Sequence, residues 1–186
     1  MSKHLTWKEE SYKTVFSCPV FDVGERLCRS PKGNLKTFSV LEAPDWAMIL
    51  PVLETERGLE FVMVKQWRHG SQEMSLEFPG GVSEPGENAE EAAAREMKEE
   101  TGYTAGKIEK LGWFYPNPAI QSNKMHYFMA WDLKEPDGQN LDPDEYLEVE
   151  IVPRDHVLQN LGKAPYTHAL IGTMISLYLQ KASIHK

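Results

Sequence analysis

Seven glutamates crowd into residues 84–100, against one arginine and one lysine. Three of them, Glu96, Glu99 and Glu100, would lie on about a third of the circumference of a helix, at about 100° per residue. Like charges at such spacings repel one another, and the helix dipole disfavours negative charge near the C-terminal end. Local stability therefore argues against this arrangement unless something neutralises it.

Two interpretations of the acidic segment compete. The first is an exposed acidic helix face, which is the commoner outcome for a run of charge. The second is a carboxylate cluster that binds Mg²⁺ or Mn²⁺, hard cations that prefer oxygen ligands. The formal net charge of −8 argues against a general nucleic-acid binder, which would need a basic face. A small anionic substrate remains compatible with this charge if cations bridge the repulsion.

The residues around these glutamates have the spacing of a known motif. Gly81 is followed by five residues and Glu87, then by seven residues and the run REMKEETGY, Arg95 to Tyr103. This stretch resembles the Nudix box of the Nudix hydrolases at every fixed polar and glycine position. Tyr103 departs from the bulky aliphatic residue that is usual at the last position. The resemblance favours the metal-binding interpretation.

The resemblance implies a metal site with two or three Mg²⁺ or Mn²⁺ ions. Glu96 and Glu100 would be direct metal ligands, and Glu99 would contribute a ligand or orient a metal-bound water. The carbonyl oxygen of Gly80 would be a further ligand. The ions would bridge the carboxylates to a substrate pyrophosphate and lower the pKa of the attacking water.

Other box residues would hold the site in shape. By the same resemblance, Glu87 and Arg95 would form an ion pair that ties the preceding loop to the helix. Gly81 would allow a backbone turn unsuited to a side chain. Gly102 stands where a residue just past a helix end is expected.

The flanks of the box resemble the ADP-ribose pyrophosphatase branch of the family. A proline near position 118 marks this branch, VKQWRHG resembles its Gln-aromatic-Arg strand, and SLEFPGGV resembles the lead-in to its box. Arg68 would then contact the diphosphate or the terminal sugar, and Glu77 would support the site or help to recognise the substrate. Alternatively, Arg68 is a surface cation and Pro118 an ordinary loop proline. Trp67 and Trp113 are core residues on the simplest interpretation, with adenine stacking as the alternative.

One loop departs from this branch. The segment YPNPAIQSNKMH stands where Ser-Pro-Gly is frequent, so Asn117, Asn123 and His126 are specificity candidates without an assigned role. A lone histidine before a strand is more often structural than catalytic.

The general base is expected outside the box. Relatives of the ADP-ribose type carry an acidic residue on a loop before the penultimate strand, and the corresponding loop here is LDPDEYLEVE. Pro143 falls where those relatives often carry a glutamate, and proline cannot accept a proton. Asp142, Asp144 and Glu145 flank it. Glu145 has the longest reach and is our choice. Alternatively, the three acidic residues only keep a surface loop soluble. The base would then be Glu99, or a metal-bound hydroxide would attack without a protein base.

These features predict a Mg²⁺-dependent pyrophosphatase acting on a nucleoside-diphosphate sugar, most simply ADP-ribose, giving AMP and ribose 5-phosphate. GDP-mannose or another nucleoside-diphosphate compound is the alternative substrate. A non-catalytic nucleotide sensor is the alternative from a different class, although idle relatives commonly lose box glutamates that this chain keeps.

The elements that must position these residues can be read from the pattern. Asn88 as N-cap, Glu91 three residues later and Gly102 predict a helix from about Ala89 to Thr101. Apolar residues on one face predict a second helix within 166–180. The strand pattern predicts strands within 14–28, 34–43, 46–54, 59–70, 75–82, 108–118 and 123–133. Residues 144–157 alternate as in a strand and then enter a helix near Asp155.

The whole chain then reads as α+β. The resemblance implies a Nudix α/β/α sandwich with a mixed sheet over 45–186, and residues 1–44 form an antiparallel strand extension expected to build a homodimer. Cys18 and Cys28 make no disulfide framework, which favours a cytoplasmic location. We expect no signal sequence, and no apolar run approaches the roughly 18–20 residues that span a membrane.

Overall fold

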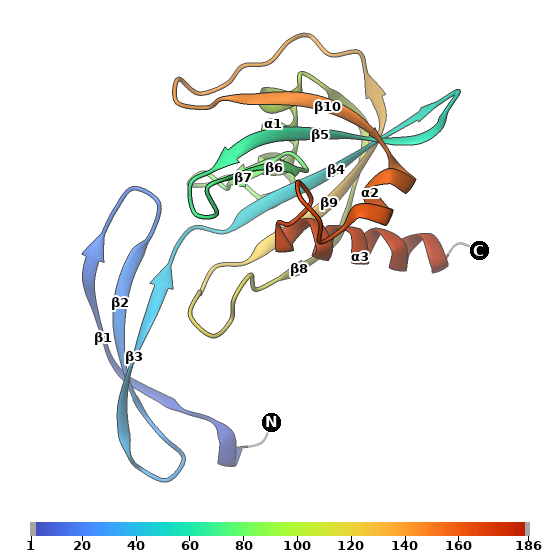
Figure 1. The fold of residues 1–186 in the computed structure, drawn as a ribbon. Coiled ribbons are helices and arrows are strands. Elements are labelled where there is room, and N and C mark those ends of the chain that lie inside the picture. The colour runs from blue at the N-terminus through green and yellow to red at the C-terminus, as the bar shows by residue number, and fades with distance from the viewer. Residues whose placement is uncertain (1–2, 185–186) are drawn as a thin grey trace. The chain divides into compact units, whose positions relative to one another are not determined.

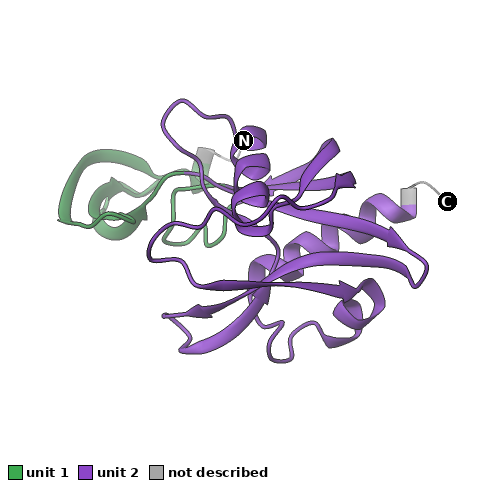
Figure 2. Cartoon of the chain, turned by 90° about the horizontal axis from the view of Figure 1, so that it is seen from above, with its two compact units in different colours: residues 1–44, 115–124 green, residues 45–114, 125–186 purple. Residues whose placement is uncertain are grey.

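The computed structural model describes residues 3–184, which form two compact units. The first unit comprises residues 1–44 and 115–124, and the second comprises residues 45–114 and 125–186 (Figure 2). The segment 115–124 thus belongs with the N-terminal strands although it lies between two strands of the second unit.

The first unit is built on a three-stranded antiparallel sheet. A short 3-10 helix, η1 (Lys3–Leu5), precedes β1 (Lys8–Ser17), β2 (Asp22–Arg29) and β3 (Leu35–Glu42), in the order β1-β2-β3. The prediction of one strand across 14–28 is wrong, because a turn separates β1 from β2. Cys18 N donates to Phe21 O at 3.1 Å across this turn, and Pro19 inside it has no N–H for a sheet ladder.

The second unit contains a seven-stranded mixed sheet. Five strands follow the order β10-β5-β4-β9-β8, while β6 pairs with β5 and β7 pairs with β4. The β4–β9 pair is parallel and the others are antiparallel. The strands are β4 (Trp46–Thr55), β5 (Gly58–Arg68), β6 (Glu73–Glu77), β7 (Gly80–Val82), β8 (Thr104–Phe114), β9 (Met125–Lys134) and β10 (Leu147–Pro153).

Helices cover both faces of this sheet (Figure 1). Alternate residues of β4 point to opposite faces: Ala47 and Ile49 pack in a cluster with α1 (Ala89–Thr101), while Met48 and Leu50 pack in a cluster with α2 (Arg154–Asn160) and α3 (Ala169–Ile184). The α/β/α sandwich is therefore confirmed.

The C-terminal helix packs as predicted but begins later than residue 166. His168 precedes its first turn, and its Nδ1 accepts a hydrogen bond from Leu170 N at 3.2 Å. The apolar face predicted from the sequence is buried in the core, at Ile171, Met174, Ile175 and Tyr178. No helix within residues 3–184 is both long and apolar enough to cross a membrane.

Candidate active site

Both ends of α1 are closed by the residues that the sequence indicated. Asn88 Oδ1 accepts hydrogen bonds from Glu90 N and Glu91 N at 3.0 and 3.1 Å, and Glu91 Oε2 accepts one from Asn88 N at 3.0 Å. At the other end, Gly102 has φ 76°, a left-handed conformation that suits glycine, and its N–H donates to Lys98 O. The predicted helix bounds and capping box are therefore confirmed.

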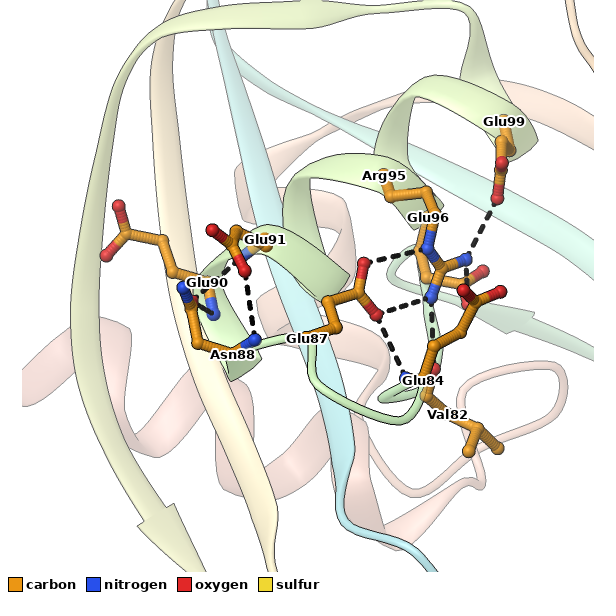
Figure 3. Close-up of polar contacts among 9 residues, drawn as sticks. All are labelled: Val82, Glu84, Glu87, Asn88, Glu90, Glu91, Arg95, Glu96 and Glu99. Carbon is orange, nitrogen blue, oxygen red and sulfur yellow. Dashed lines mark hydrogen bonds and ion pairs between the residues drawn. The ribbon is translucent and has the colours of Figure 1, made fainter.

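Arg95 ties the loop before α1 to the helix (Figure 3). Its Nε and Nη2 donate to the two carboxylate oxygens of Glu87 at 2.9 and 3.0 Å, and Nη2 also donates to Val82 O at 3.1 Å. Glu87 Oε2 in turn accepts a bond from Glu84 N at 3.0 Å. The bonds from Arg95 hold the pKa of the Glu87 carboxyl below its ordinary value. One ion pair therefore fixes a loop that contributes to the site.

The same guanidinium also neutralises part of the acidic face. Arg95 Nη1 donates to Glu96 Oε1 at 2.9 Å and to Glu99 Oε2 at 3.0 Å (Figure 3). Burial nevertheless raises the pKa of Glu96, with Arg95 acting in the opposite direction. One cation shared among three carboxylates leaves the site acidic.

Glu100 is the most deeply buried of the box glutamates, with 3% of its surface exposed. Its Oε2 accepts one hydrogen bond, from Gly80 N at 3.0 Å. Burial, with smaller contributions from the negative charges of Glu96 and Glu145, raises the pKa of Glu100 to about 8. A buried carboxylate of this kind binds a proton or a cation readily.

The glycines beside Glu100 and Glu96 allow the backbone to approach closely. Gly80 and Gly81 pair with Met48 and Ala47 of β4. A Cβ at Gly80 would lie 2.8 Å from Met48 Cα, and one at Gly81 would lie 2.6 Å from the carboxyl carbon of Glu96. A side chain at Gly80 would collide with the backbone of β4, and one at Gly81 would displace the Glu96 carboxylate.

A pocket of about 340 Å³ gathers residues from four parts of the second unit. They come from β5, from β7 and the loop after it, from α1, and from the loop before β10. The pocket is lined by Gln66, Arg68, Gly80, Gly81, Val82, Glu84, Arg95, Glu96, Glu100, Asp142 and Glu145. The structure thus brings together Arg68, the metal-site candidates Glu96 and Glu100, and the base candidate Glu145.

Arg68 is held by a buried carboxylate. Its Nε and Nη2 donate to Glu77 Oε1 and Oε2 at 2.8 and 2.7 Å, and only 1% of Glu77 is exposed. Burial by itself would raise the pKa of Glu77, but the bonds from Arg68 outweigh it, and the net pKa lies below its ordinary value. Glu77 does not line the pocket; it orients the arginine that does.

The loop between β9 and β10 brings Glu145 to the pocket through a local turn. Glu145 N donates to Asp142 O at 3.0 Å, and Asp142 N donates to Glu145 Oε2 at 3.2 Å. Of the three acidic candidates, Asp142 and Glu145 line the pocket and Asp144 does not.

The metal-ligand types fit a hard cation. Among residues 3–184, no three or more His, Cys, Asp or Glu side chains are gathered closely enough to hold a metal ion. Glu96 and Glu99 turn toward Arg95, and Glu100 turns toward Gly80 N. All the candidate donors are oxygen atoms, as Mg²⁺ requires, and two of the carboxylates have raised pKa values.

Other predicted residues are not among those that line this pocket. Pro118 and Asn117 lie in the segment of the first unit, where Asn117 O accepts bonds from Ile120 N and Gln121 N in a turn. His126 Nε2 lies 3.1 Å from Asp45 Oδ2, which is consistent with a structural role. Asn123 is buried, and neither polar atom of its side chain has a hydrogen-bond partner within the described chain.

The interpretation of two tryptophans as core residues is wrong. Trp67 and Trp113 are 47% and 46% exposed. Conversely, sequence reasoning missed Gln66 and Glu84, which line the pocket. Gln66 could have been found, because residues two apart on a strand share a face and Arg68 is two positions later.

Comparison with known proteins agrees with this geometry. A model of the NUDIX domain matches residues 44–170, and the chain belongs to the Nudix family. It is 34% identical over 158 residues to an ADP-ribose pyrophosphatase of Bacillus subtilis (strain 168), covering 84% of each chain. It is 28% identical to a methanol dehydrogenase activator of Bacillus methanolicus, covering 97% of this chain and 98% of the relative.

A solved structure shows the same fold. The crystal structure of an ADP compounds hydrolase superposes with a TM-score of 0.85 at 24% identity, covering 99% of this chain and 98% of the other. The chain is a Nudix pyrophosphohydrolase of the ADP-ribose pyrophosphatase-like branch. Enzymes of this family act on small nucleotide substrates and generally use divalent metal ions such as Mg²⁺.

Proposed function

We propose that the protein hydrolyses the pyrophosphate bond of an ADP-sugar in the presence of Mg²⁺ or Mn²⁺, with ADP-ribose giving AMP and ribose 5-phosphate. The observation that carries the proposal is the single pocket that joins Glu96 and Glu100 to Arg68 and Glu145. A diphosphate requires cationic partners, and hydrolysis requires an acceptor for the proton of the attacking water. In this pocket, Arg68 is a cationic partner for the diphosphate, Glu145 is a candidate proton acceptor, and the carboxylates of Glu96 and Glu100 are candidate metal ligands.

Each side chain takes a defined part. Two or three divalent ions bound by Glu96, Glu100, Glu99 and the Gly80 carbonyl would neutralise the diphosphate and acidify a bound water. Arg68, oriented by Glu77, would bind a diphosphate oxygen or the terminal sugar.

Glu145 would accept a proton from the attacking water while the water oxygen bonds to phosphorus and the bridging P–O bond breaks. Glu99 is the second candidate for the base. Its side chain is 34% exposed and bonded to Arg95, and it does not line the pocket, which favours Glu145.

Two relatives guide the choice of substrate. The Bacillus subtilis relative is named for ADP-ribose, which supports an ADP-sugar over GDP-mannose. The Bacillus methanolicus relative is named as an activator of methanol dehydrogenase and matches nearly the whole chain. Activation of a dehydrogenase is therefore a second candidate function, to be tested by adding the protein to an alcohol dehydrogenase assay.

The decisive experiment is an activity panel with both products resolved. ADP-ribose, other ADP-sugars, GDP-mannose and a nucleoside triphosphate are each incubated with Mg²⁺, with Mn²⁺ and with excess EDTA. We expect AMP and ribose 5-phosphate from ADP-ribose at the highest kcat/KM, and no product with EDTA. Glu100→Gln serves as the matched inactive variant. A higher kcat/KM on GDP-mannose, or turnover in EDTA, would overturn the proposal.

We further propose a homodimer built on the first unit, in a cytoplasmic protein. Among the described residues of β1, β2 and β3, only Gly24 and Cys28 are buried, and Val15 and Phe16 are exposed. A sheet with so little covered surface is stabilised when a second copy covers it. The two cysteines are unpaired, which supports a reducing compartment.

A further inference from the structure

The first part of the loop that carries Glu145 is hydrogen-bonded to the C-terminal end of α1. Residues 135–146 connect β9 to β10, and three groups near the start of this loop donate to carbonyl oxygens at the end of α1. Asp137 N donates to Gly102 O at 3.2 Å, the Gln139 side chain donates through Nε2 to Glu100 O at 2.7 Å, and Asn140 N donates to Glu99 O at 2.8 Å. The last carbonyls of a helix have no partner within the helix, so the loop satisfies them.

The backbones also meet closely at this point. Gly102 and Gly138 both have positive φ angles, of 76° and 99°. A Cβ at Gly102 would lie 2.8 Å from Gly138 O and 3.0 Å from Gly138 N. Gly102 therefore serves the loop as well as the helix end, because a side chain there would push the loop away.

The anchored part leaves little free chain before Glu145. Asn140 is bonded to α1, and Asp142 already belongs to the turn that Glu145 closes. Two residues of extended chain span roughly 7 Å at most. The turn therefore stays within a short distance of the helix that carries Glu96 and Glu100.

We infer that Gln139 is a positioning residue for Glu145: by bonding to the carbonyl of Glu100, it fixes the base loop and the metal-site helix in one frame. The inference rests on the proposed function, in which Glu145 takes the proton. Of the three bonds, that of Gln139 is the one made by a side chain, so a substitution can remove it while leaving the backbone unchanged.

The test compares two substitutions of Gln139. Gln139→Glu keeps the shape but replaces the donor with a carboxylate oxygen that faces a carbonyl at the negative end of the helix dipole. Gln139→Lys keeps a donor and places a positive charge there. We expect Gln139→Glu to lower kcat about 10-fold with KM changed less than twofold, since one hydrogen bond is lost and repulsion added. Gln139→Lys should keep more than half of the activity.

A double-mutant cycle identifies the residue through which Gln139 acts. In a Glu145→Gln background, Gln139→Glu should cause no further loss of kcat, because the group it positions is already gone. Equal losses in both backgrounds would overturn the inference. So would a kcat within twofold of wild type for Gln139→Glu.

Amide hydrogen exchange tests the anchor without any turnover. Gln139→Glu should speed exchange at Asn140 and Asp142, while amides of β4 stay protected and report intact folding. Gln139→Lys should leave all of them protected. Unchanged exchange at Asn140 in Gln139→Glu would overturn the anchor. If wild-type protein fails to hydrolyse any nucleotide sugar, the proposed function fails, and the exchange result still decides the anchor.

Discussion

Burial and charge act against one another at Glu100. The carboxylate lies almost out of water, bonded to one backbone N–H and facing two further carboxylates, Glu96 and Glu145. Arg95 makes five bonds of its own, to Glu87, Glu96, Glu99 and Val82, and none to Glu100. Glu100 is thus a buried carboxylate to which Arg95 makes no bond, and we propose it as a ligand of the metal ion.

Replacing Glu100 with glutamine tests that placement. We expect Glu100→Gln to lower kcat at least ~10²-fold at saturating Mg²⁺, because a ligand that stabilises transition-state charge is lost. Excess EDTA should abolish wild-type turnover, and Mg²⁺ or Mn²⁺ should restore it. Glu90→Gln, on the exposed first turn of the same helix, is the control. Near-wild-type steady-state rates in both Glu96→Gln and Glu100→Gln would contradict the metal assignment.

A second substitution series concerns the base. We expect Glu145→Gln to lose ~10²-fold or more in kcat with little change in KM, the usual scale for loss of a general base. Asp144→Asn is the matched control, since Asp144 lies in the same loop but does not line the pocket. Asp142→Asn completes the set. If all three variants keep more than half of the activity, the base lies in the box, and Glu99→Gln becomes the variant to measure.

The helix α1 has stabilising residues at both ends and mutually repelling glutamates on one face. Its N-terminal cap and its left-handed Gly102 favour the helix, whereas Glu96, Glu99 and Glu100 at its C-terminal end disfavour it. Packing of Ala92, Ala93 and Met97 against the sheet holds the helix in place. The helix can therefore present carboxylates that an isolated peptide would not tolerate.

The capping box should affect stability and leave the chemistry unchanged. Asn88→Ala removes the acceptor for Glu90 N and Glu91 N, so we expect the free energy of unfolding to fall by about 1 kcal/mol. Asn88→Asp keeps an acceptor and serves as the control. Urea denaturation measures the change, with kcat at saturating metal expected to stay within twofold of wild type. A loss of kcat without a loss of stability would mean that Asn88 acts on the site directly.

At the scale of the whole molecule, the sheet of the first unit is largely exposed. Aromatic side chains of this unit, such as Phe16 and Trp7, remain partly accessible to water. Tyr12 lies over Gly24, and Trp7 contacts Phe38 edge to face, but these contacts cover only part of the sheet. We therefore expect a second copy to complete this unit.

Light scattering at micromolar concentration measures the predicted assembly. We expect the mass of a homodimer, about twice 21.2 kDa. Phe16→Glu, which places a charge on the exposed sheet, should shift the mass toward the monomer, while Lys13→Glu at an already polar position of the same strand should not. A monomer mass for the wild-type protein would refute the dimer.

The sequence alone determined the features that depend on neighbours along the chain. The bounds of α1 and its capping box follow from spacing within one helix, where geometry is nearly fixed. The Glu87–Arg95 pair followed from the resemblance to the Nudix box. The box spacing also indicated the family, and the resemblance to that family implied the sandwich. Local turns were harder to place, as the break between β1 and β2 at Cys18–Phe21 shows.

Only the tertiary structure decided which distant residues meet. The loop around Pro143 offered three carboxylates in sequence, and the fold placed Asp142 and Glu145 in the pocket but not Asp144. It likewise exposed Trp67 and Trp113, set Glu77 behind Arg68, and bound Gln139 to the end of α1. The physical reason is that these features depend on how separate strands, helices and loops pack against one another, which no local spacing encodes.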